Sequence, residues 1–358
     1  MRRRRFGLFS PAVVRGALAA AVAVAILGLG PVGTASALSG NQKLVVVLCK
    51  FPDKTDEPQP VSYFQSMFSA TGAGSTSVFD YWKEVSYGQL DLTGTVVKGW
   101  YTVDLTLAQW QAKEGAGGDR PGLVDACAKK AVNDVNFNDF AGVVVLTNQS
   151  NRSEDLFGAG PATTINGTTY NNLGSMVSEW DQQFNGILHE SGHAFRFNHS
   201  RKLTPQNGQS DYGDVFDVMS CLGCQGTTST YGVNGLGGPG LNVVQVDTAG
   251  WIAPSRNLTT FSNSTCGQQT IGMAALNHPE AAGFLEARIP ASVPIGITGV
   301  STTGDRYALE FREKSSWDGG ILQDGVLVHV HGQDGYSYWV ESPTHDVPQW
   351  RAHLVERW

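Results

Sequence analysis

The segment HESGHAFRFNH, residues 189–199, constrains this chain more than any other feature. It brings three of the eight histidines into eleven residues. His189 and His193 are four residues apart, so on a helix they lie on one face, one turn apart, and both can point at one metal ion. His199 can reach the same ion only if the helix ends and the chain turns back. We therefore predict a helix over residues 182–197 that ends in a sharp turn.

Zinc chemistry explains why these residue types occur at this spacing. A catalytic zinc ion takes three protein ligands and keeps a fourth position open. His189, His193 and His199 supply three ligands of the right kind. Glu190 follows the first of them and can project beside a water on the metal, where it would act as general base. The pattern predicts a zinc site at which water becomes the nucleophile.

The first 37 residues are predicted to be a secretory signal peptide. Arg2 to Arg5 form a basic start, an apolar run covers residues 17–29, and Ala35-Ser36-Ala37 provides small residues for cleavage after Ala37. A membrane anchor is the alternative, but the apolar run is short for a span and contains Gly and Pro. The run Arg3-Arg4-Arg5-Phe6 also resembles a twin-arginine signal, so the export route stays open. We expect a secreted, extracellular protein.

Removal of these residues makes the chain more acidic. The whole chain has 25 Lys and Arg against 32 Asp and Glu, and the signal segment contains five Arg and no acidic residue. The mature chain therefore has 20 basic residues against 32 acidic ones. This balance argues against nucleic acid or an anionic membrane as a partner. We expect a monomer that acts on protein or peptide substrates.

The five cysteines predict disulfide bonds, because export leads to an oxidising compartment. Their odd number leaves one thiol without an intrachain partner, and the sequence does not fix the pairing. They are Cys49, Cys127, Cys221, Cys224 and Cys266.

The order of apolar and polar segments predicts two domains after the signal peptide. Residues 38–250 alternate between strands and helices, as in an α/β or α+β domain with a twisted mixed sheet. Residues 251–358 contain short apolar runs between Gly, Asp, Ser and Thr, as in a small β-rich domain. Within the first domain we expect strands at 43–49, 89–97 and 142–146, and helices at 77–84, 121–135, 182–197 and 241–249.

Several segments together resemble a known family, the secreted metzincin zinc peptidases of the immune inhibitor A type and the related gametolysin-like enzymes. They are SVFDYWKEVSYGQLDL at 77–92, HESGHAFRFNHS at 189–200, YGDVFDVMS at 212–220, AGWI at 249–252, RYALEFREKSSWD at 306–318 and GVLVHVH at 325–331. The resemblance implies a zinc metalloendopeptidase with the three histidines as ligands and Glu190 as base. It also implies that Met219 lies in a tight turn beneath the ligands.

The chain departs from this family pattern at two positions. The family usually has Gly where the active-site helix breaks with positive φ, and this chain has Arg196, which costs about 1 kcal/mol unless the turn moves to Asn198. Several metzincins have a Tyr two residues after the Met that supports the transition state. This chain has Cys221 at that position, so the sequence assigns this role to no residue. Some immune inhibitor A enzymes use Asp as the third ligand, so His199 makes this chain more similar to the gametolysin-like enzymes.

Two further hypotheses stay open from the sequence. Asp211, Asp214 and Asp217 could bind calcium, or they could be turn and capping residues. The chain could also be an inactive or latent zinc-binding protein that acts through its β-rich C-terminal region. Aromatic residues of that region could form a binding strip or could be core, and they are Trp317, Tyr336, Tyr338 and Trp339.

Overall fold

The computed structural model describes residues 38–113, 119–149, 157–160, 162–206, 209–220, 229–230, 236–259, 270–297, 303–321 and 323–340. All of them belong to one compact unit, Ala37–Trp358. The fold is mixed α/β, with several sheets and few helices. The predicted signal peptide and three of the cysteines, Cys221, Cys224 and Cys266, lie outside the described residues.

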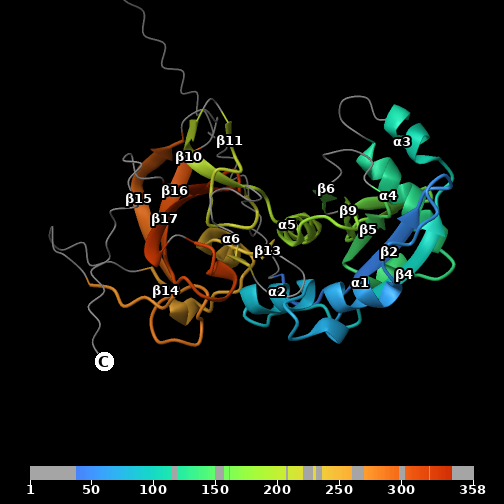
Figure 1. Cartoon of the computed structure of the whole chain (residues 1–358). Helices are drawn as coiled ribbons and strands as arrows, with labels where there is room; N and C mark the ends of the chain where they lie inside the picture. The colour runs from blue at the N-terminus through green and yellow to red at the C-terminus, as the bar shows by residue number, and fades with distance from the viewer. Residues whose placement is uncertain are drawn as a thin grey trace, which may run out of the picture. The chain divides into compact units, whose positions relative to one another are not determined.

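A five-stranded sheet forms the centre of the N-terminal part, with strand order β4-β2-β5-β9-β6 (Figure 1). Its strands are β4 (Val96–Thr102), β2 (Leu44–Lys50), β5 (Gly142–Thr147), β9 (Gly174–Glu179) and β6 (Phe157–Ala159). The first four are parallel, and β6 runs antiparallel to β9 at the edge. The apolar runs in β2 and β5 are buried, as their composition predicts for strands covered on both faces.

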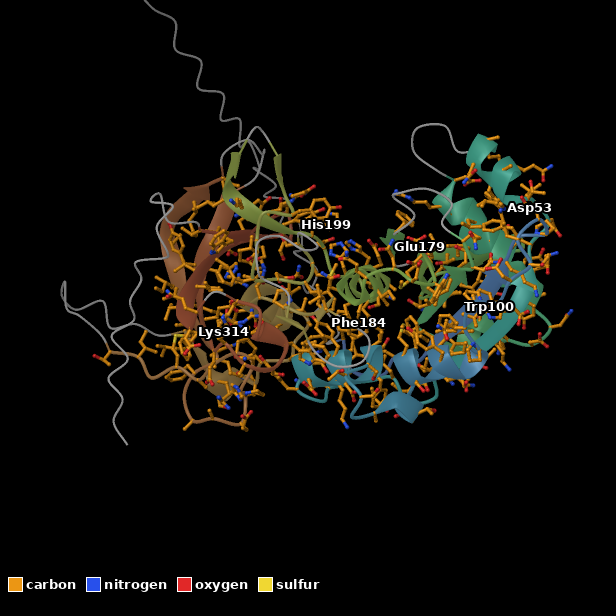
Figure 2. All side chains as sticks on the ribbon, viewed as in Figure 1. Asp53, Trp100, Glu179, Phe184, His199 and Lys314 are labelled. Atoms are coloured by element: carbon orange, nitrogen blue, oxygen red, sulfur yellow. A yellow bond between two sulfur atoms is a disulfide. The ribbon has the colours of Figure 1, made fainter. Side chains whose placement is uncertain are left out.

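Helices cover both faces of this sheet. Alternate residues of β2 belong to two separate apolar clusters, because successive side chains of a strand point to opposite faces. One cluster includes side chains of α1 (Val61–Phe68), α2 (Val78–Val85) and α5 (Phe184–Ala194), and the other includes α3 (Leu107–Lys113) and α4 (Arg120–Ala128). Trp100, labelled in Figure 2, lies on β4. On the first face its ring packs against that of Phe64 of α1, with centroids 5.6 Å apart.

A buried disulfide ties α4 to the sheet. It joins Cys49 of β2 to Cys127 of α4, and both residues are fully buried. The expectation of disulfide bonding is confirmed for this pair.

A seven-stranded sheet follows the order β11-β10-β18-β17-β16-β15-β14. Its strands are β10 (Ser200–Gln206), β11 (Gln209–Asp211), β14 (Asn257–Leu258), β15 (Glu286–Gly296), β16 (Thr303–Arg312), β17 (Gly325–Gly332) and β18 (Ser337–Trp339). The region after residue 250 is rich in strands, as predicted. Because β10 pairs in parallel with β18, the sheet also takes strands from before residue 250. The division into two domains at that point stays a prediction.

The remaining elements are short. They are β1 (Gly40–Asn41) paired with β3 (Leu90–Asp91), β7 (Thr163–Ile165) with β8 (Thr168–Tyr170), β12 (Ser229–Thr230) with β13 (Leu236–Gly237), helix α6 (Val243–Thr248), and 3-10 turns at Ala70–Gly72, Lys129–Ala131, Phe137–Asp139, Pro254–Arg256 and Ser316–Asp318. Within the described residues, no helix has the length and apolar character needed to cross a membrane.

Several predicted boundaries were wrong. The strand expected over 89–97 is two strands, β3 and β4, separated by a turn at Thr93 and Gly94. Asp91 Oδ1 accepts a hydrogen bond from the Thr93 backbone N–H at 2.8 Å, and Gly94 has a φ of 91°, so a side-chain turn interrupts the alternation. The helix expected over 121–135 ends as an α-helix at Ala128, and that over 182–197 covers only Phe184–Ala194.

Candidate metal centre

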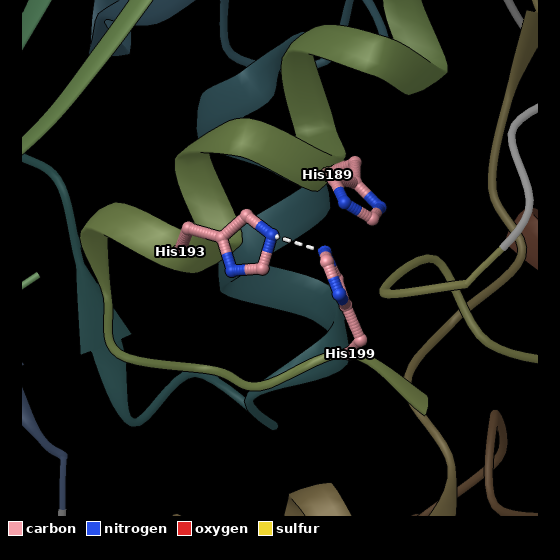
Figure 3. A group of neighbouring side chains, drawn as sticks. All are labelled: His189, His193 and His199. Atoms are coloured by element: carbon pink, nitrogen blue, oxygen red, sulfur yellow. Dashed lines mark hydrogen bonds between the residues drawn. The ribbon is translucent and has the colours of Figure 1, made fainter. Parts of the chain in front are cut away.

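The structure brings the three predicted ligands together. His189 and His193 project from successive turns of α5, and His199 comes from the extended segment that leads into β10 (Figure 3). One ring nitrogen of each histidine lies within 4.8 Å of the others. The Nε2 atoms of His193 and His199 are 2.9 Å apart. The three side chains are therefore close enough to bind one metal ion.

Backbone carbonyls orient two of the rings. His189 Nδ1 lies 2.7 Å from the carbonyl oxygen of Val218, and His193 Nδ1 lies 2.8 Å from that of Phe197. A carbonyl oxygen only accepts, so each Nδ1 carries the proton and each Nε2 keeps a free lone pair. Partners of this kind are typical behind metal-ligating histidines.

The three imidazole rings are also in the neutral protonation state that binding of a cation requires. Burial lowers the pKa of His189 to about 3 and that of His193 to about 4, and it lowers the pKa of His199 as well. The imidazoles are therefore neutral at pH 7, as metal ligation requires. Two neutral Nε2 lone pairs that face each other repel unless a proton or a cation lies between them. A cation held by the three nitrogens would remove this repulsion.

A Schellman turn ends α5 and directs the chain back to the site. The Arg196 N–H donates to the His193 carbonyl at 2.8 Å, and the Phe197 N–H donates to the Gly192 carbonyl at 3.0 Å. Arg196 has a φ of 74°, so the bend lies at the position predicted to be left-handed and does not move to Asn198. The exposed Arg196 side chain donates to Asn172 Oδ1 at 3.3 Å.

Glycine is expected to fit this turn better than arginine does. The left-handed conformation costs a non-glycine residue about 1–2 kcal/mol. We expect Arg196→Gly to raise the free energy of unfolding by about 1 kcal/mol, measured by urea denaturation. Arg196→Ala is the matched control, because it loses the same side chain but keeps the strain. A glycine variant no more stable than the alanine variant would contradict this account of the turn.

Side chains of α6 and its cap hold the segment that carries His199. Gln245 Nε2 donates to the Asn198 carbonyl at 2.6 Å, and Asn242 Nδ2 donates to Ser200 Oγ at 3.1 Å. Both amide residues are buried. Since Asn198 and Ser200 are the neighbours of His199 in the chain, these bonds fix the backbone on each side of the third ligand.

Met219 lies directly against α5. A Cβ atom at Gly192 would come within 2.3 Å of Met219 Sδ and within 3.3 Å of the Trp82 ring, so only glycine fits at this position of α5. Met219 is fully buried, and its carbonyl accepts from the Ser200 N–H at 2.8 Å. The methionine thus packs against the helix that bears His189 and His193.

Glu190 is buried beside the ligands. Gly158 of the edge strand β6 packs closely against Glu190. A Cβ atom at Gly158 would lie 2.9 Å from Glu190 Oε2 and 2.4 Å from the Glu190 carbonyl oxygen. Burial raises the pKa of Glu190 to about 7, and the charge of Arg120 opposes this shift. A carboxyl group with this pKa can both take and give a proton near neutral pH.

The three aspartates proposed for calcium have protein partners instead. Asp214 Oδ2 lies 2.9 Å from His329 Nε2 and accepts from Asn242 Nδ2 at 3.0 Å. Asp217 accepts backbone N–H groups of Met219 and Asn242, both at 2.6 Å, and Asp211 pairs with Arg201. Within the described residues, the three histidines are the one group of His, Cys, Asp or Glu close enough to hold a metal. The calcium hypothesis gains no support.

The C-terminal aromatic residues do not form a common exposed strip. Trp317 is 3% exposed and packs on Tyr81 with ring centroids 5.0 Å apart. Tyr338 is fully buried. Trp339 packs on Phe216 at 5.5 Å, and Tyr336 lies under the Arg201 guanidinium. These contacts are those of core and packing residues.

The sequence did not point to Tyr212 as a residue of this site. Its ring centroid lies 4.2 Å from that of His199 and 6.0 Å from that of His189. Burial raises the pKa of Tyr212, and the Glu190 carboxylate raises it further, so the phenol lies within electrostatic range of that carboxylate. The one available signal was its place at the start of the YGDVFDVMS segment. Cys221, where the resemblance led us to look for a Tyr, lies outside the described residues.

Comparison with known proteins adds no further support. No family model matches the chain, and no curated protein matches it. The assignment of function therefore depends on the geometry and chemistry of the site.

Proposed function

We propose that this chain is a secreted zinc-dependent endopeptidase of the metzincin type. The observation that carries the proposal is the convergence of His189, His193 and His199, with ring nitrogens within 4.8 Å of one another. The buried carboxyl group of Glu190 on the same helix and Met219 beneath that helix support the proposal. The signal-like N-terminus supports export of the protein.

The chain's own residues account for the proton transfers of hydrolysis. A zinc ion held by the three histidines would polarise the scissile carbonyl and lower the pKa of water to about 7. Glu190 would take one proton from the attacking water as the C–O bond forms. It would then give that proton to the amine nitrogen as the C–N bond breaks, so its carboxylate is regenerated. The elevated pKa of Glu190, about 7, suits both transfers.

The edge strand β6 favours a peptide substrate. β9 pairs with one side of β6, and the described residues include no strand on its other side. An extended peptide can pair with such an edge through its backbone, so that the scissile bond lies over the adjacent site. Gly158, in the middle of β6, lies against Glu190 and His193. The proximity of strand edge and carboxyl group favours peptide hydrolysis over other hydrolytic reactions.

A second candidate function is a latent zinc-binding protein without peptidase activity. Arg196, which stands where the family usually has glycine, is the sequence feature that favours this alternative, but the turn after α5 forms with arginine in the left-handed conformation. The observed geometry therefore favours the enzyme.

Loss of the bond between Gln245 and the Asn198 carbonyl is expected to weaken metal binding. Gln245→Met keeps the side-chain length and removes the donor, which frees the backbone next to His199. We expect zinc affinity to fall by about 10-fold or more in a competition titration with a chromophoric chelator. Gln183→Met, at an exposed glutamine, is the control and should bind zinc as the wild type does. Equal affinities for the two variants would show that Gln245 does not position the ligand.

Casein hydrolysis by the purified secreted protein tests the proposed function. Cleavage that a chelator abolishes and added zinc restores would support a zinc endopeptidase. A protein that binds zinc and cleaves neither casein nor a mixed peptide library would favour the latent alternative.

A further inference from the structure

Tyr212 combines three properties that a purely structural residue does not need. It is 42% exposed, it has a left-handed backbone with a φ of 61°, and its ring contacts two of the candidate metal ligands. For a bulky residue this conformation costs about 1–2 kcal/mol. Strained residues of this kind persist where the surrounding structure fixes them, and they are found most often at functional sites.

Anchors on both sides hold Tyr212 in place. Before it, Asp211 pairs with Arg201 both in the β10–β11 ladder and through an ion pair. After it, Gly213 packs so closely on Lys202 that a Cβ would lie 2.2 Å from Lys202 Cγ. Next comes Asp214, which is fully buried and bonded to His329 at 2.9 Å. These contacts fix the position of the tyrosine although its side chain is half exposed.

The Tyr212 ring lies next to two of the candidate ligands and is partly open to solvent. Its plane is tilted by 45° from the His199 ring at 4.2 Å and by 29° from the His189 ring at 6.0 Å. Among the described residues, the Tyr212 hydroxyl group makes no hydrogen bond. A neutral phenol is a good hydrogen-bond donor. Tyr212 thus adds a hydroxyl donor, without a hydrogen-bond partner among the described residues, to the group of side chains formed by the candidate ligands.

We propose that the Tyr212 hydroxyl donates a hydrogen bond to the scissile carbonyl oxygen as that oxygen gains negative charge in the tetrahedral transition state. This inference rests on the proposed peptidase function. The phenol keeps its proton throughout, so the proton balance still runs through Glu190. A fixed donor aimed at a developing oxyanion stabilises the transition state more than the substrate. Tyr212 is a catalytic residue in this account, because it contacts a reacting atom.

Two substitutions separate the hydroxyl from the ring. Tyr212→Phe removes only the donor and keeps the contact with His199, and Tyr212→Ala removes both. Rates are measured with a fluorogenic peptide built on the cleavage site that casein hydrolysis reveals. Binding is measured by calorimetry with a phosphonamidate dipeptide, whose tetrahedral phosphorus carries the charged oxygens of the transition state. Zinc content and melting temperature serve as controls for folding and metal binding.

For Tyr212→Phe we expect kcat to fall about 100-fold, with KM within about threefold of wild type. Affinity for the phosphonamidate should fall by a similar factor, while zinc content and melting temperature stay unchanged. A phenylalanine variant with wild-type kcat and phosphonamidate affinity would overturn the proposal, including the case in which only Tyr212→Ala is impaired, since the ring would then only position His199. A wild-type protein that neither cleaves peptides nor binds the phosphonamidate would refute the proposed function itself, and the role of Tyr212 with it.

Discussion

The Glu190→Gln protein and the wild type are both expected to bind one zinc ion per chain, and the variant is expected to cleave casein about a thousandfold more slowly than the wild type. Glutamine keeps the size of the buried side chain beside Gly158 but cannot take a proton from water. A positioned general base contributes about 10²–10⁴-fold to a rate. Folding should not suffer, because burial already disfavours the charged form of this carboxyl group. The measurement combines elemental analysis with initial rates of casein cleavage.

A surface carboxylate provides the control for this substitution. Glu57 pairs with Lys50 at the surface, and its side chain is 49% exposed. Glu57→Gln removes the same charge away from the site and should leave the rate within about twofold of wild type, since surface charges contribute little. A Glu190→Gln protein with wild-type activity would rule out Glu190 as the base.

Removal of the disulfide is expected to cause the largest loss of stability. Cys49 and Cys127 are 78 residues apart, and closing a loop of that size restricts the unfolded chain by about 4–5 kcal/mol. The Cys49→Ala/Cys127→Ala protein should therefore unfold with about 4 kcal/mol less free energy than the wild type. For a chain of this size, that loss lowers the melting temperature by roughly 6 °C. Urea denaturation and calorimetry measure the two quantities.

The reduced wild-type protein separates the cross-link from the packing. Reduction opens the bond but leaves both sulfur atoms in the core, whereas the double alanine variant also removes their volume. Most of the loss should already be present after reduction. A reduced protein as stable as the oxidised one would show that the bond does not constrain the unfolded chain as expected.

The parts of the fold that were predicted correctly are those set by local patterns. The apolar runs of β2 and β5 are buried strands, and the histidine pair lies on one face of α5. The break between β3 and β4 was missed although the alternation changes phase there: Leu90 and Leu92 would lie on one face of a continuous strand and Val97 on the opposite face. The Asx turn at Asp91 depends on a side-chain bond that apolar alternation does not reveal.

In the candidate site, too, the features set by local patterns were predicted and those set by tertiary contacts were not. His189 and His193 lie on one face of α5, as their spacing predicted, and the left-handed Arg196 lies at the predicted bend. Met219 packs against Gly192 of the same helix. The contact of Tyr212 with His199 spans thirteen residues and depends on the ladder between β10 and β11, so no local pattern indicates it. Likewise, the bond from Gln245 to the Asn198 carbonyl joins two segments by tertiary packing alone.

Zinc stoichiometry tests the central claim, that the three histidines hold a catalytic metal. Elemental analysis would compare the purified wild-type protein with the His189→Ala/His193→Ala variant after dialysis against zinc at a concentration that saturates only tight sites. We predict one zinc ion per wild-type chain and none in the variant, since two of three ligands are lost. A wild-type chain without zinc, or a variant that keeps a full equivalent, would contradict the account.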